Sequence, residues 1–179
     1  MGTPANDHTE SFWQADVAEA ARALADVLAE EDADVLVVYD ENGGYGHPDH
    51  IQVHRVGHRA AEIAGTDRVF EATMNRDQMV EMMRQAREAG IEGFDDDEDP
   101  ETFGLPDVQI TTAVDVTAWL AEKKASMRAH ASQIAEDSWF LTLPEGVFEM
   151  VFGTEWFVRT IPEFAGSLPA DRETWLLDD

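Results

Sequence analysis

Residues 41–50, ENGGYGHPDH, bring together glycines, two histidines and a carboxylate within one short stretch. Neutral imidazoles and carboxylates are zinc ligands, and imidazole also exchanges protons near neutral pH. Glycines let a loop approach a ligand closely because they carry no Cβ atom. We therefore interpret His47, Asp49 and His50 as a candidate cluster for metal binding and proton transfer.

Apolar residues flank this stretch on both sides. The run VLVVY predicts a buried strand at residues 34–39, and residues 48–64 predict a helix with Pro48 in its first turn. Open α/β sheets place their binding sites between such a strand and such a helix. A purely structural interpretation stays open, because His47 and Asp49 could simply cap this helix, whose dipole favours an early carboxylate.

Helices and strands are expected to alternate along the rest of the chain. The expected helices are 11–29, 76–89, 117–134 and 145–152, and the expected strands are 68–74, 108–116 and 156–161. Ser11 with Gln14 indicates a capping box, and Asn75 is the expected cap of the second of these helices. This order predicts a single α/β domain over residues 1–179. Its sheet would be mixed and largely parallel with helices on both faces, and residues 162–179 would form an irregular tail.

The stretch YDENGGYGHPDHIQVHRV, residues 39–56, resembles the second signature of the LmbE-like deacetylases. That family includes the PIG-L de-N-acetylases, the deacetylase of mycothiol biosynthesis and the mycothiol conjugate amidase. Four further segments resemble it: ITTAVDV at 110–116, KKASMRAHASQI at 123–134, FGTEWFVR at 152–159, and GTPAND at 2–7 followed by SFWQAD. The resemblance covers nearly the whole chain and implies a Rossmann-like three-layer αβα fold.

The resemblance also implies a zinc-dependent hydrolase that removes an acetyl group from an N-acylated amino sugar or a related conjugate. His50 would be a zinc ligand, and His47 would be the general acid that also faces the oxyanion. Asp49 would orient His47 and favour its protonated form. The Tyr45 hydroxyl would bind the developing oxyanion. The sequence does not choose between the mycothiol deacetylase and the conjugate amidase.

Three further positions would contact substrate by resemblance: Gly44, Gly46 and His130. For His130, a role as a hydrogen-bonded structural histidine is equally open. His54 and His58 follow His50 at spacings that place all three on one helix face, where a pair could chelate a metal. Because the family's zinc uses only the first of them, we expect His54 to pack beneath the site and His58 to face solvent.

The family opens with a strand ending in AHPDDE, which supplies two of its three protein zinc ligands and the general base. The present sequence contains no such motif. By resemblance it begins partway through the domain, as an N-terminally truncated LmbE-like fold. A misassigned start, a fragment or a lost first half would each explain this.

A truncated domain of this kind has consequences for activity and association. We expect Zn²⁺ binding to be weak or absent and the chain alone to be inactive. Its bared strand edge would favour a homo-oligomer or a complementing N-terminal chain. The alternative is a non-catalytic domain that binds a sugar or a partner protein.

Composition narrows the range of partners. With 38 acidic residues against 12 basic ones, the formal net charge is -26, which repels nucleic acid and anionic membranes. No run approaches the about 18 apolar residues of a membrane helix. The start MGTPANDHTE has neither the basic region nor the apolar core of a signal peptide. The absence of cysteine excludes disulfides and thiolate metal sites and is compatible with the cytoplasm, where we expect the protein.

The acidic surface has two interpretations. It can be a solvated surface suited to a salty cytoplasm, or it can bind cations or a partner. The stretch DDDED at residues 95–99 could bind calcium. It lacks regular EF-hand spacing, so we expect a solvated loop there.

Overall fold

The computed structural model describes residues 4–88 and 103–177 of the 179-residue chain. The acidic stretch at residues 95–99 lies outside the described residues, so its interpretation as a solvated loop stays a prediction.

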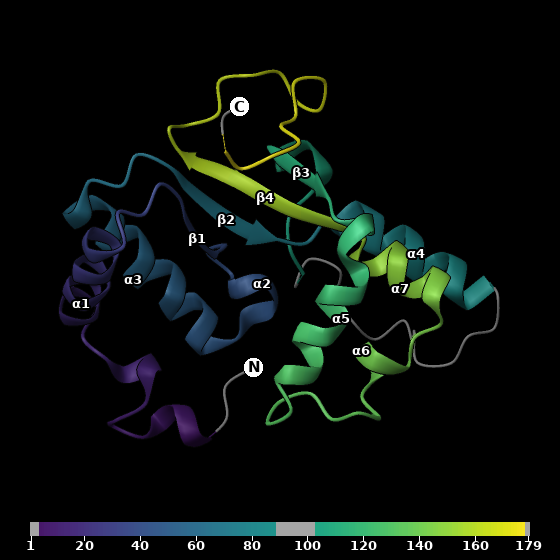
Figure 1. Ribbon diagram of the computed structural model, residues 1–179, viewed down its shortest axis with the longest axis horizontal. Coiled ribbons are helices and arrows are strands. Elements are labelled where there is room, and N and C mark those ends of the chain that lie inside the picture. The colour runs from purple at the N-terminus through teal and green to yellow at the C-terminus, as the bar shows by residue number, and fades with distance from the viewer. Residues whose placement is uncertain (1–3, 89–102, 178–179) are drawn as a thin grey trace.

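Four strands form one mixed sheet (Figure 1). They are β1 (Leu36–Tyr39), β2 (Val69–Thr73), β3 (Thr112–Asp115) and β4 (Thr154–Ile161), and their order in space is β1-β2-β4-β3. β1 pairs parallel with β2, whereas β4 runs antiparallel to both of its neighbours. The α/β class and the mixed sheet are confirmed, and among these four strands β1 and β2 form the one parallel pair.

The helices of the described ranges form two groups. They are α1 (Val17–Glu30), α2 (Gly43–Gly46), α3 (Pro48–Ala64), α4 (Arg76–Glu88), α5 (Leu120–Ala129), α6 (Trp139–Thr142) and α7 (Glu145–Phe152). Figure 1 shows α1 and α3 together at one side of the molecule and α4, α5, α6 and α7 gathered at the other. The three-layer arrangement stays a prediction.

Of the helices that the structure describes, none combines the length and the apolarity needed to cross a membrane.

Helix α3 joins β1 to β2 and packs closely on β1. Gly57 makes this approach possible, because a Cβ atom there would lie 2.3 Å from Cγ1 of Val38. On the side of α3 that meets α1, small and aliphatic side chains form a buried cluster: Ala21, Ala25, Leu28, Val56 and Ala60. Burial of a valine or leucine side chain stabilises a fold by about 1.5–3 kcal/mol, so this cluster holds α1 on α3. A second buried cluster, Val38, Ala61 and Val69, fixes α3, and with it the candidate site, on the sheet.

The first long helix begins later than the sequence predicts. Asp16 caps α1, because its carboxylate accepts a hydrogen bond from the backbone N–H of Glu19 at 2.8 Å. The hydroxyl of Ser11 instead donates to the carbonyl oxygen of Asn6 at 2.9 Å. The predicted capping box at Ser11 is therefore wrong, and residues 12–14 form a separate 3₁₀ turn.

Elsewhere the predicted boundaries hold more closely. Both α3 and α7 have the predicted bounds. Asn75 caps α4 as expected, since its side-chain oxygen accepts a hydrogen bond from the N–H of Gln78 at 3.1 Å. Helix α5 ends at Ala129 rather than at residue 134. Residues 162–177 contain no helix or strand, and the irregular tail expected at 162–179 stays a prediction.

Candidate active site

Between β1 and α3 the chain turns through a glycine loop, which we define as residues 40–46. Three of its residues have positive φ, of 64°, 74° and 82°: Gly43, Gly44 and Gly46. A Cβ atom at Gly43 would lie 2.8 Å from both the Cβ of His50 and the backbone nitrogen of Ile51. Only glycine fits this close crossing, so the path of the loop over the start of α3 is set by its sequence.

Asp40 anchors the glycine loop from below. Its side chain is buried, and one oxygen accepts a hydrogen bond from the N–H of Gly44 at 2.8 Å. The other oxygen accepts from the hydroxyl of Thr73, at the end of β2, at 2.6 Å. Both oxygens of this buried carboxylate are thus satisfied, and the loop is tied to the ends of two adjacent strands.

His47 caps the N-terminus of α3 with its side chain. Its Nδ1 atom accepts a hydrogen bond from the backbone N–H of Asp49 at 3.2 Å. A ring nitrogen that accepts carries no proton, so the neutral ring holds its proton on Nε2. The cap is compatible with a role for His47 as a hydrogen-bond donor to the oxyanion, because it leaves an N–H on the far side of the ring. The protonated form implied for a general acid would lose the cap, since a protonated Nδ1 no longer accepts.

The carboxylate of Asp49 points to a different partner from the one implied by the resemblance. Its Oδ1 accepts a hydrogen bond from the side-chain amide of Asn6 at 3.4 Å. His47 is held by the backbone of Asp49, whereas the Asp49 carboxylate connects α3 to the segment before α1. Asn6 is itself buried, and its carbonyl oxygen accepts from Ser11 and Gln14.

His50 lies in the first turn of α3 with its ring fixed on two sides. Its Nδ1 atom is 3.2 Å from the carbonyl oxygen of Gly43. A carbonyl only accepts, so Nδ1 carries the proton and Nε2 keeps a lone pair. The ring also stacks on Tyr39 with centroids 4.0 Å apart. Zinc-binding histidines commonly donate one N–H to a carbonyl and bind metal through the other nitrogen, so His50 fits a zinc ligand.

The surroundings of His50 favour its neutral, metal-binding form. Burial lowers the pKa of His50 below its ordinary value of 6.5, and the neighbouring His47 acts in the same direction. The Gly43 carbonyl and the carboxylates of Asp49 and Asp40 oppose this lowering of the pKa. Burial also raises the pKa of Tyr39, with a contribution from Tyr45.

Tyr45 stands at the edge of the cluster and faces solvent. Its ring meets His50 edge-on with centroids 5.2 Å apart, and the ring of His47 lies 4.8 Å from that of His50. Tyr45 also lines a cavity of about 570 Å³ whose other walls are largely apolar and come mainly from β2, β4, α4, α6 and α7. The structure thus brings Tyr45, His47 and His50 together, and of these three Tyr45 alone lines the cavity. Gly44 is buried in the loop, and a Cβ atom there would lie 4.0 Å from Cε of Met74, which lines the cavity.

His130 does not join this group. It is exposed at the C-terminal end of α5, and its Nδ1 atom is 2.9 Å from the carbonyl oxygen of Ser126. None of the contacts recorded for it among the described residues reaches the glycine loop. Its role in substrate binding stays a prediction, as do those of Gly44 and Gly46.

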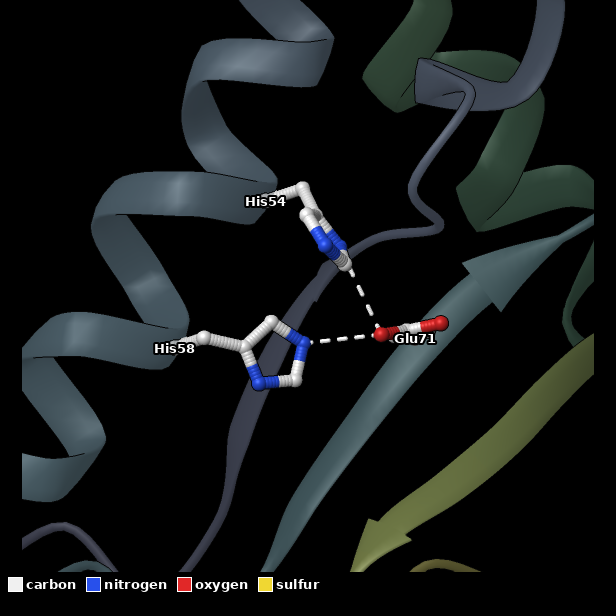
Figure 2. Close-up of side chains that lie close together, drawn as sticks. All are labelled: His54, His58 and Glu71. Carbon is white, nitrogen blue, oxygen red and sulfur yellow. Dashed lines mark hydrogen bonds and ion pairs between the residues drawn. The ribbon is translucent and has the colours of Figure 1, made fainter.

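A second histidine cluster lies farther along α3 (Figure 2). His54 donates from Nδ1 to the carbonyl oxygen of Tyr39 at 3.1 Å, so it packs beneath the site as expected. His58 does not point to solvent alone, because its Nε2 is 2.8 Å from Oε1 of Glu71 on β2. Together these three side chains could hold a metal ion.

Sequence reasoning missed Asp40, Asn6 and Glu71. For Asp40 a signal existed, since an aspartate between a strand and a glycine turn commonly accepts from the turn's N–H groups. Asn6 and Glu71 meet their partners only through the tertiary fold, so no local pattern marks them.

Comparison with known proteins gives relatives that share one description. No profile of a known protein family matches the chain. The 1D-myo-inositol 2-acetamido-2-deoxy-alpha-D-glucopyranoside deacetylase of Acidothermus cellulolyticus is 43% identical over 164 residues, which cover 88% of this chain and 56% of that protein. The protein of the same description from Geodermatophilus obscurus is 40% identical over 173 residues, with 88% and 59% covered. For a second such deacetylase of Frankia alni the identity is 38% over 176 residues, with 88% and 60% covered.

The chain spans between half and three fifths of the length of the curated relatives it matches. The three relatives named above are described as deacetylases of the same acetamido sugar conjugate. Their likeness to this chain, at 36% to 43% identity, supports the resemblance to the LmbE-like deacetylases.

Proposed function

We propose that this chain forms the part of a zinc-dependent N-deacetylase site that holds the HPDH turn. The observation that carries the proposal is the setting of His50. Its Nδ1–H is bound by Gly43, its ring is held by Tyr39, and its Nε2 lone pair is left for a metal. His47 lies beside it with a proton on Nε2, so a metal ligand and a proton donor are adjacent.

Each residue of the turn would have a separate task. Zinc, when bound, would lower the pKa of a coordinated water and polarise the amide carbonyl. His50 would hold the ion through Nε2. The Nε2–H of His47 would donate a hydrogen bond to the reacting carbonyl oxygen. To protonate the departing amine, His47 would first take up a second proton on Nδ1 from solvent, which would end its hydrogen bond with the N–H of Asp49. The Tyr45 hydroxyl, on an exposed ring beside both imidazoles, would donate to the oxyanion.

The proposed substrate is an N-acetylated amino sugar joined to a second polar group. The relatives' descriptions support this, because each names an acetamido sugar linked to inositol. Gly44 and Gly46 would leave room for the acetamido group to approach the backbone. His130 would act at the rim of the pocket.

Hydrolytic zinc sites commonly use three protein ligands and an open position for water. His50 is one of these. By resemblance, the other two ligands and the general base belong to an AHPDDE segment, which this sequence does not contain. We therefore expect the chain by itself to release no acetate, even with added Zn²⁺.

The test is a chimera of the Acidothermus cellulolyticus deacetylase in which the 164-residue matched segment is replaced by the corresponding residues of this chain. Acetate release from the acetamido sugar–inositol conjugate is then measured with Zn²⁺. We expect the chimera to be active, and His47→Gln to reduce its rate by about a hundredfold or more. His58→Gln is the matched control, since His58 also lies on α3 but outside the turn, and it should keep the rate.

A folded chimera that binds Zn²⁺ but releases no acetate would contradict the proposal. That outcome would favour the second candidate, a non-catalytic sugar- or partner-binding domain. The specific observation that favours this candidate is the cap that His47 gives to α3, which a purely structural histidine would also make. Acetate release by the 179-residue chain alone would refute the expectation that it lacks its base.

A further inference from the structure

Helix α3 and strand β2 bring two imidazoles to one carboxylate. His54 and His58 are one helical turn apart with ring centroids separated by 4.6 Å, and Glu71 reaches them from β2 (Figure 2). Oε1 of Glu71 lies 2.8 Å from Nε2 of His58 and 3.4 Å from Nδ1 of His54. The side chain of Glu71 is only 13% exposed, and those of the histidines are 23% and 27% exposed, so solvent reaches one side of the cluster.

The charge of this cluster is unbalanced. A mostly buried carboxylate is costly unless it is paired or coordinates a metal. Among the residues that the structure describes, the side chain of Glu71 meets the two imidazoles. His58 donates to it, whereas the Nδ1–H of His54 is donated to Tyr39, and neither ring carries a charge unless it is protonated. A divalent cation would supply the missing positive charge and would be bound by ligand types that zinc and nickel prefer.

We propose that His54, His58 and Glu71 form a second binding site for a late first-row divalent cation such as Zn²⁺, separate from the proposed active site. The site shares no ligand with the HPDH turn, because His54, His58 and Glu71 all lie outside residues 47–50. This proposal therefore does not depend on the proposed function.

To bind zinc, the three ligand atoms would have to move slightly closer together. The three ligand atoms lie within 4.8 Å of one another. Zinc–ligand bonds of about 2.0–2.2 Å place tetrahedral ligand atoms roughly 3.4 Å apart, so the widest pair closes by at most roughly 1.4 Å. Oε1 of Glu71 already lies within 3.4 Å of both ring nitrogens, so this movement falls on the two imidazoles and requires rotation of their side chains on α3.

Metal binding requires His58 to change its tautomer, but no side chain has to gain or lose a proton. His58 now donates from Nε2 to Glu71, and shifting its proton to Nδ1 frees a lone pair toward the carboxylate. For His54, binding through Nδ1 would cost the hydrogen bond to the Tyr39 carbonyl. With this cost and only three protein ligands, the site should bind more weakly than a closed structural zinc site.

The test is isothermal titration of ZnCl₂ into the 179-residue chain, with excess Mg²⁺ to occupy the exposed carboxylates. Variants His58→Gln and Glu71→Gln should each weaken binding by about tenfold or more, as expected for loss of a metal-site partner. His130→Gln is the matched control for an exposed histidine, and His50→Gln separates the two sites. Both controls should leave this binding event unchanged.

Unchanged affinity in the cluster variants, or its loss in His50→Gln instead, would overturn the proposal. If a cluster variant fails to fold, ring NMR signals of the unaltered chain decide. Stoichiometric Zn²⁺ should shift or broaden the signals of His54 and His58, and signals that stay in place would equally overturn the site.

Discussion

The imidazole of His50 lies flat on the phenol ring of Tyr39, with centroids 4.0 Å apart and ring planes within 3° of parallel. Tyr39 is the last residue of β1, and His50 lies in the first turn of α3. The stack therefore joins the end of the strand to the start of the helix across the glycine loop. Together with the bond to Gly43, it fixes the His50 ring before any metal binds, which lowers the entropy cost of coordination.

Gly43→Ala should destabilise the protein more than Gly65→Ala. Both glycines have positive φ, of 64° and 72°, so both substitutions carry the backbone strain of a left-handed residue, about 1–2 kcal/mol. At Gly43 the new Cβ atom also meets His50 and Ile51 at 2.8 Å, whereas at Gly65 nothing lies within 4 Å. Urea denaturation of both variants measures the difference. Equal losses would show that the loop can move away from α3.

Asp40→Ala should lower the free energy of unfolding by about 1–3 kcal/mol, because it leaves the N–H of Gly44 and the hydroxyl of Thr73 without their acceptor in a buried place. Asp40→Asn keeps one acceptor oxygen and should lose less. Chemical denaturation ranks the stability losses of these two variants against that of Thr73→Val, which removes only the hydrogen bond between Thr73 and Asp40. If Asp40→Ala were as stable as the unaltered chain, the loop would not depend on this anchor.

Asp107 should make stability depend on pH in the acid range. The Arg172 guanidinium, helped by the amide of Asn75, holds the pKa of Asp107 below its ordinary 3.8, and burial opposes this. A carboxyl group with a lowered folded pKa stabilises the fold above its unfolded value, and this contribution disappears as pH falls through the folded value.

Asp107→Asn should therefore be less stable than the unaltered chain near neutral pH, and the gap should narrow below about pH 4. Urea midpoints of both proteins measured across this range give the gap directly. A gap that is constant with pH would mean that the Arg172 contact contributes nothing through charge.

Added salt should stabilise the chain. With a net charge of -26, the folded protein repels itself, and salt screens this repulsion over a distance of about 10 Å at 0.1 M. We expect the free energy of unfolding to rise as NaCl is added, with partial unfolding at the lowest ionic strength. Sucrose at matched osmolality is the control for non-ionic effects. No difference between the two solutes would favour an acidic surface whose charges are already compensated.

Helix bounds and helix caps could be predicted where a local sequence pattern determines them. The bounds of α3 follow from Pro48 at its start and Gly65 at its end, and the cap at Asn75 follows from its position before an apolar-periodic run. The cap at Ser11 was wrongly predicted because Asp16, equally suited by residue type, begins the regular helix. The side chains of Ser11 and Asp16 can both cap a helix, and the packing of α1 on α3 selects Asp16.

In the candidate site, too, contacts between residues close in sequence could be predicted, and contacts between distant residues could not. The grouping of Tyr45, His47 and His50 follows from their nearness in the chain and from the glycines between strand and helix. The contact between Asn6 and Asp49 joins residues 43 positions apart, and Glu71 meets His58 across the space between β2 and α3. Such pairs depend on how the elements pack, which no window of the sequence contains.

The zinc position in the chimeric deacetylase tests the central claim most directly. Diffraction data collected at the zinc absorption edge locate the ion independently of any assumed mechanism. We expect an anomalous peak about 2.0–2.1 Å from Nε2 of His50, with Nδ1 still bound to the Gly43 carbonyl. A zinc ion in the pocket that is bound by other residues, with the His50 ring turned away from it, would contradict the assignment of the HPDH turn as part of the metal site.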